Sequence, residues 1–191
     1  MSNDGPIEYL GKRIEVEDLP APYRPPVVRD RAGIYAEVEA AWEELDSFVA
    51  TLQVTDFDRT VPGLGEGADS WTIKDVIAHL AAWRRNGARV AALQAEAGAL
   101  PVNAFPGSLL GVKTHEFNAR LLTDWRKRPL EDVLREHRDS HAALRTALDA
   151  VPEAHLMDGE HAVLWLTPAI GHPRLHLADL RRALEDPDDL S

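Results

Sequence analysis

Three histidines carry the clearest chemical signal in this sequence: His79, His172 and His176. His172 and His176 are four residues apart, so on a helix both imidazoles project from one face. His79 lies far from them in the chain, within an amphipathic stretch. If two helices face each other, the three imidazoles could hold one metal ion and leave positions open for water or a substrate. Imidazole ligands favour Zn²⁺, Ni²⁺ or Fe²⁺ over Mg²⁺ and Ca²⁺, which prefer oxygen.

Four further residues could lie behind the ligands or line the pocket: Asp179, Trp83, Asn118 and His141. Asp179 follows His176 by three residues, and its carboxylate could accept a hydrogen bond from that imidazole and fix its tautomer. The alternative is a surface ion pair between Asp179 and Arg182. Trp83 is expected in the core or in a pocket wall. Asn118 could hydrogen-bond a substrate near the mouth of the site.

The sequence leaves a competing interpretation open for each group of histidines. His137 and His141 are also four residues apart and lie on an inward-facing stripe. They could begin a second metal site, but no third ligand is evident, so a polar patch in the bundle core is favoured. His79 could equally be a neutral core imidazole that is satisfied by hydrogen bonds.

The amino-acid composition excludes several classes of function. The chain has 191 residues, enough for one domain with a substantial core, and its net charge of −11 argues against a nucleic-acid-binding surface. It has no cysteine, which excludes disulfides, thiolate metal ligands and a cysteine nucleophile, so any thiol chemistry needs an external thiol. No apolar stretch approaches the ~20 residues of a membrane span, and the polar N-terminus lacks a signal core. We therefore expect a cytoplasmic protein that does not contact membranes.

Hydrophobic periodicity of 3.6 predicts helices along most of the chain. Asp30 is a candidate N-cap of the first helix, and Thr72 with Asp75 fits a capping box at the second. Pro129 is placed at the first position of a later helix. The expected long helices cover residues 30–52, 72–97, 129–151 and a final segment that ends near residue 185, with a short helix at 114–127.

Residues 1–29 differ from the rest because they contain five prolines, which disfavour both helices and central strands. We expect an extended arm there, and no segment shows a convincing strand or hairpin signal. The sequence therefore predicts an all-α fold: an up-down-type four-helix bundle at 30–191, with a proline-rich N-terminal arm at 1–29 and an extra short helix.

Pro173 leaves the start of the last helix open. A proline inside a helix removes a hydrogen bond and kinks the chain. Either a helix that starts at Thr167 and Pro168 bends at Pro173, or the helix begins at Pro173 and His172 lies outside it.

Several motifs in combination resemble the DinB/YfiT-like superfamily of four-helix bundles, and most of all its ClbS/DfsB branch. They span most of the chain after residue 30. The motifs are the run from Trp71 to Trp83, Phe117-Asn118-Ala119-Arg120, the run from Arg128 to Leu134, Ser140-His141-Ala142-Ala143-Leu144, and the closing His172-x-x-x-His176-x-x-Asp179-Leu180.

The resemblance implies a metal triad of one histidine on the second helix and two on the fourth, which maps onto His79, His172 and His176. It also implies similarity to transferases that use mycothiol, bacillithiol or glutathione. The ClbS/DfsB branch is associated instead with hydrolytic protection against a reactive genotoxin.

Three functions follow as hypotheses. The first is a metal-dependent transferase or hydrolase that acts on a reactive small molecule, in detoxification or stress protection, with an external low-molecular-weight thiol as a candidate cofactor. The second is a metal-free protective protein that hydrolyses or sequesters a genotoxin. The third is a non-enzymatic dimeric bundle. A homodimer is expected from the resemblance and from the abundance of two-fold dimers.

Overall fold

The computed structural model describes residues 7–9, 12–14, 30–65, 67, 70–97, 112–156 and 167–185. Most of these residues are helical, so the predicted all-α class is confirmed. The helices are α1 (Arg31–Thr51), α2 (Ile73–Ala97), α3 (Val112–Trp125), α4 (Leu130–Ala150), α5 (Glu153–Leu156) and α7 (His172–Arg182), with a 3₁₀ turn η3 (Val54–Asp58) and a π-helical turn η5 (Thr167–Gly171). None of them is long and apolar enough to cross a membrane in the part of the chain that the structure describes.

Local signals start the first two long helices where the sequence predicts. The Asp30 carboxylate accepts a hydrogen bond from the Gly33 N–H at 2.8 Å and so caps α1. At α2, the Thr72 N–H donates to Asp75 Oδ2 at 3.0 Å, and the Asp75 N–H donates to Thr72 Oγ1 at 3.2 Å. This reciprocal capping box satisfies two backbone donors at the end of the helix.

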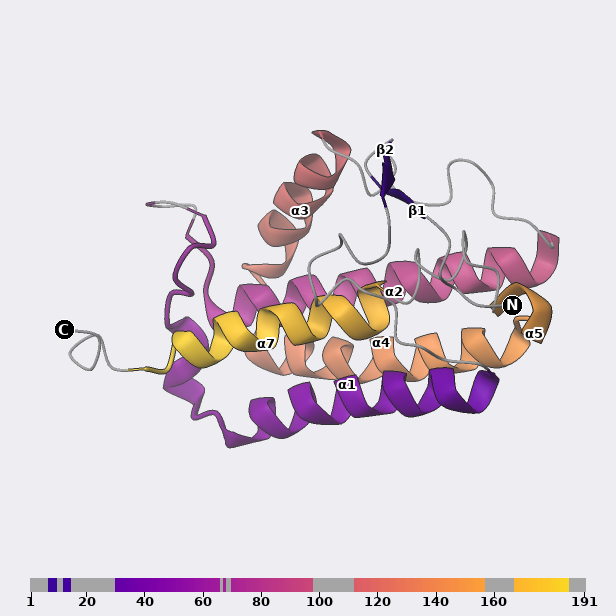
Figure 1. The fold of residues 1–191 in the computed structure, drawn as a ribbon. Coiled ribbons are helices and arrows are strands. Elements are labelled where there is room, and N and C mark those ends of the chain that lie inside the picture. Colours follow the sequence, from indigo (N-terminus) through magenta and orange to yellow (C-terminus); the bar gives the residue numbers. More distant parts are fainter. Residues whose placement is uncertain are drawn as a thin grey trace.

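The bundle consists of four helices packed side by side: α1, α2, α4 and α7. The helix α3 lies outside it, beside α2 (Figure 1). The colours in the same view show that α1 and α7 run in one direction and α2 and α4 in the other. The helices α2 and α4 can share a direction because the chain returns through α3 between them. The contact between α2 and α4 is the most extensive one, while α7 packs against both α1 and α2.

The bundle core consists of two apolar clusters with a polar layer between them along the helices. Toward one end, Ile34, Leu144 and Ile170 are buried; toward the other, Leu45 and Leu177 are buried. Each helix carries polar or aromatic residues at the level between its two apolar stretches. These residues are Trp42 on α1, His79 and Arg84 on α2, His137 and Ser140 on α4, and His172 and His176 on α7.

The N-terminal arm contains two short strands, which the sequence analysis did not predict. β1 (Ile7–Tyr9) pairs with β2 (Lys12–Ile14) in antiparallel register, with Ile7 opposite Ile14. Strands of three residues are too short to display a recognisable alternation of apolar and polar side chains. The rest of the predicted arm lies outside the described residues.

The start of α7 excludes one of the two alternatives that Pro173 left open, the one in which His172 lies outside the helix. The π-helical turn η5 leads directly into an α-helix that begins at His172, so His172 belongs to the helix. Pro173 then occupies the first turn, where a missing N–H costs no helical hydrogen bond. The proline is thus compatible with two histidines on one helical face.

Candidate metal centre

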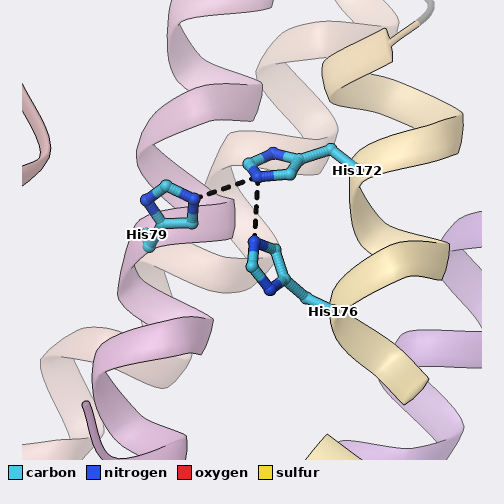
Figure 2. Close-up of side chains that lie close together, drawn as sticks. All are labelled: His79, His172 and His176. Atoms are coloured by element: carbon cyan, nitrogen blue, oxygen red, sulfur yellow. Dashed lines mark hydrogen bonds between the residues drawn. The ribbon is translucent and has the colours of Figure 1, made fainter. Parts of the chain in front are cut away.

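The structure brings the three histidines of the sequence analysis together. His79 reaches across from α2, while His172 and His176 project from successive turns of α7 (Figure 2). His172 Nε2 lies 3.0 Å from His79 Nε2 and 3.0 Å from His176 Nε2. All three ligand atoms lie within 4.8 Å of one another. In the part of the chain that the structure describes, this is the cluster able to hold a metal ion.

Hydrogen bonds alone do not account for this convergence. A neutral imidazole nitrogen carries either one hydrogen or one lone pair, so His172 Nε2 cannot make a proper hydrogen bond to both neighbours at once. An ion bound at 2.0–2.1 Å in tetrahedral geometry would separate its nitrogen ligands by roughly 3.3 Å. Two of the three separations, both 3.0 Å, are close to that value, and the third lies within 4.8 Å, so a shift of one ring brings all three nitrogens to one ion. The donor set therefore fits a metal ion.

Burial keeps the three imidazoles in the form that binds metals. The pKa values of His79 and His172 are held well below the usual 6.5, chiefly by burial and further by the neighbouring imidazoles. Burial also lowers the pKa of His176, although the Asp179 carboxylate acts in the opposite direction. Neutral rings offer their lone pairs to an ion, whereas protonated rings would repel it.

Asp179 makes both of the interactions that the sequence left open. The His176 Nδ1 lies 3.1 Å from Asp179 Oδ2, and the Arg182 guanidinium donates to the other carboxylate oxygen. A carboxylate on Nδ1 places the proton there and leaves Nε2 free to face the other two rings. Arg182 in turn restrains the carboxylate.

His79 is positioned by aromatic packing. Its ring lies edge-on to Trp71, with ring centroids 5.0 Å apart, and to Trp83, at 6.2 Å. Its Nδ1 is buried and has no hydrogen-bond partner among the described residues. The alternative of a core histidine satisfied by hydrogen bonds is therefore weakened, because only the nitrogen that faces the other imidazoles has a polar contact.

Trp83 forms a wall of the centre. Its ring lies 5.9 Å from that of His172 and 5.3 Å from that of Phe117 on α3. Its Nε1–H donates to Asn118 Oδ1 at 3.1 Å, so the amide oxygen expected to bind a substrate is used to hold α3 against α2. The sequence analysis named Phe117 only as part of a motif and gave it no role at the site, although its position next to Asn118 could have indicated one.

A buried arginine close to the centre was missed as well. Arg84 is 2% exposed and donates to the carbonyl of His137 at 3.0 Å and to Ser140 Oγ at 3.4 Å. Burial lowers the pKa of Arg84 to about 9, and its positive charge contributes to the low pKa of His172. Arg84 follows Leu80 by four residues, so its place on the buried face of α2 could have been inferred.

His137 and His141 take no part in this centre. Both rings stack on Trp42 of α1, with centroids 4.4 and 4.2 Å away. His141 Nε2 lies 3.2 Å from a Glu39 oxygen. His137 Nε2 lies 3.3 Å from an Asp46 oxygen without an aligned hydrogen bond. The pair belongs to a polar layer between α1 and α4, in keeping with the favoured interpretation.

Comparison with protein families places these observations in context. Residues 38–181 match the family of the mycothiol maleylpyruvate isomerase N-terminal domain, which covers about three quarters of the chain and includes all three histidines. The chain belongs to this family. The family is part of the DinB/YfiT-like helical superfamily, so the superfamily resemblance is confirmed, while the ClbS/DfsB branch is not. Neither the curated proteins nor the solved structures contain a significant match.

Proposed function

We propose that this protein is a metal-dependent enzyme, a thiol-dependent transferase or hydrolase, that acts on a reactive small molecule. The observation that carries the proposal is that three buried imidazoles bring their ligand nitrogens within 4.8 Å of one another beside an aromatic wall. A divalent transition metal held by His79, His172 and His176 would supply a Lewis acid that activates water or an external thiol near neutral pH.

The chain's own residues would prepare that chemistry. Asp179 keeps the proton of His176 on Nδ1, so that Nε2 faces the centre. Trp71 and Trp83 exclude water and offer apolar surface to a carbon skeleton. Arg84 adds positive charge behind His172, which favours an anionic nucleophile.

The nucleophilic thiol has to come from outside, because the chain has no cysteine. Members of the matched family are often metal-binding enzymes connected with mycothiol. Mycothiol is therefore the first thiol to test, ahead of bacillithiol and glutathione. A role in detoxification or stress protection fits a thiol that captures electrophiles.

The narrower resemblance to the ClbS/DfsB branch rests on sequence motifs and makes genotoxin hydrolysis a second activity to test. The homodimer and the cytoplasmic location remain predictions of the sequence analysis. Neither is needed for the metal centre, since all three histidines come from one chain.

The test is an activity screen of the protein loaded separately with Zn²⁺, Ni²⁺ or Fe²⁺. Each form is given mycothiol, bacillithiol or glutathione with a panel of electrophiles, and thiol consumption is measured. We expect activity with one metal and one thiol, and its loss in His176→Ala but not in the matched variant His141→Gln, which changes a histidine outside the centre. Activity that persists after metal removal and in His176→Ala would instead support a metal-free protein.

A further inference from the structure

A cavity of about 670 Å³ is lined by residues of α2, α3 and α4. Figure 1 shows that α3 lies beside α2, outside the four-helix bundle. The volume of the cavity is within the range of small-molecule sites. Neither the three histidines nor Trp83 line it. Trp83 and Phe117 are in ring contact, and Phe117 does line the cavity, so the cavity adjoins the metal centre without opening onto the histidines.

The walls of the cavity suit a flat apolar molecule. Phe117, Leu121 and Trp125 of α3 form one side, and Ala82 and Ala88 of α2 form the other. Two aromatic side chains opposite two alanines leave a slot in which a planar ring can stack on aromatic surface.

The rim carries more positive than negative charge. Three arginines line the cavity, Arg85, Arg89 and Arg120, with two acids, Asp124 and Glu136. Arg85 and Glu136 neutralise each other through two hydrogen bonds of 2.8 and 3.0 Å, and the remaining charges of the lining are Arg89, Arg120 and Asp124. In a chain with a net charge of −11, this local balance favours an anion.

Asn86 holds one of the arginines of the lining, Arg89. Its Oδ1 accepts hydrogen bonds from Arg89 Nε at 3.4 Å and Nη2 at 3.2 Å, which fixes the orientation of the amide. The amide nitrogen is therefore turned away from Arg89; it is buried and has no partner among the described residues. Because this nitrogen has no accessible surface, Asn86 supports the position of Arg89 at the cavity and does not itself offer a donor to a ligand.

We propose that this cavity is a second binding site, for a small monocarboxylate with a flat apolar body. A planar carboxylate matches the forked donors of arginine. Asp124 disfavours a doubly charged head group such as a phosphate. Because no metal ligand lines the cavity, the site binds its ligand independently of the metal centre and of the proposed enzymatic function.

The experiment is calorimetric titration of the wild-type protein, after treatment with a chelator, with 2-naphthoate and with the neutral 2-naphthalenemethanol. We expect 2-naphthoate to bind with a dissociation constant of about 1 mM or tighter, and the neutral compound at least about fivefold more weakly. No binding of 2-naphthoate at about 5 mM would overturn the proposal, as would equal affinity for the two compounds.

Variants then locate the site. Arg120→Gln removes an exposed arginine of the rim and should weaken 2-naphthoate binding about three- to tenfold, with little change for the neutral compound. Ala82→Phe should block both compounds by filling the slot. Arg181→Gln, which changes another exposed arginine on α7, is the control and should alter neither. Binding that survives both Arg120→Gln and Ala82→Phe would place the ligand elsewhere and refute the assignment.

Discussion

Two pairs of histidines with the same spacing have different surroundings in this protein. His172 and His176 on α7 are four residues apart, as are His137 and His141 on α4, and all four lie at the polar level of the bundle. On α7 the Nε2 atoms are turned toward each other and toward His79. On α4 the Nε2 atoms lie near carboxylates of α1, and the rings stack on Trp42.

The difference shows that a spacing of four residues places two imidazoles on one helical face. Whether they can bind a metal ion depends on the residues of the facing helix. Opposite α7, α2 presents the third imidazole of His79 between tryptophan rings. Opposite α4, α1 presents Trp42, on which both imidazoles stack, and the carboxylates of Glu39 and Asp46, which lie near the Nε2 atoms. The first arrangement leaves a point of convergence for an ion, whereas the second pairs each ring separately.

Arg84 connects the two regions. Its guanidinium lies 4.6 Å from the Trp42 ring and donates to the His137 carbonyl, and its charge also acts on His172. One buried cation thus contributes to the polar layer and to the electrostatics of the candidate metal centre.

The largest expected effect is a loss of metal binding that occurs when the α7 pair is changed and not when the α4 pair is changed. Replacing His172 by Ala removes the imidazole that lies closest to both other rings, and we expect metal affinity to fall by more than about 100-fold. Elemental analysis of the purified variant measures the loss. His141→Gln is the control and should keep about one ion per chain; an equal loss in both variants would mean that the α4 pair also binds metal.

A change in the α4 region should alter stability without altering metal binding. Trp42→Ala removes the ring that stacks on His137, His141 and Arg84. We expect a loss of about 2–3 kcal/mol in the free energy of unfolding, because a large half-buried ring leaves a gap. Urea unfolding measures this loss. Metal affinity that drops together with stability would contradict the separation of the two regions.

A smaller effect on metal affinity is expected from changing Asp179, whose carboxylate contacts His176. Asp179→Asn keeps the shape of the side chain but removes the charge that orients His176. We expect metal affinity to fall about 10- to 100-fold, measured by competition with a chromogenic chelator. Arg182→Gln, which leaves the carboxylate in place, should lower the affinity less; a larger loss in Arg182→Gln would argue that Asp179 acts mainly through its surface ion pair.

The smallest effect concerns pH. Burial holds the pKa of His137 well below its ordinary value of 6.5, so the folded protein keeps this ring neutral. In the unfolded chain, His137 takes up a proton as pH falls through about 6.5. The unfolded state then binds more protons than the folded state, so lower pH shifts the folding equilibrium toward it. The stability of the metal-free protein should therefore fall from pH 7 to pH 5.

The variant His137→Gln isolates this contribution. Its unfolding free energy should depend on pH less steeply than that of the wild type, by up to about 1.4 kcal/mol per pH unit below 6.5. Urea unfolding of both metal-free proteins at several pH values gives the slopes. Identical slopes would show that His137 does not titrate differently in the folded and unfolded states.

Features that depend on neighbouring residues were predictable. Asp30 caps α1, and Thr72 with Asp75 forms the capping box of α2, because these hydrogen bonds join residues three apart. Features that depend on distant contacts were not. Arg84 is buried only because α4 offers it a carbonyl and a hydroxyl, and the cavity beside α2 exists only because α3 leaves the bundle there.

The sequence by itself determined the helices, their apolar stripes, the absence of any internal thiol and the presence of three histidines with suitable spacing. Periodicity and caps are short-range properties, and ligand chemistry belongs to the residue type. Only the tertiary structure decided which histidine pair meets a third imidazole and which meets carboxylates. That choice depends on how α2 faces α7 and α1 faces α4, a matter of packing between helices distant in the chain.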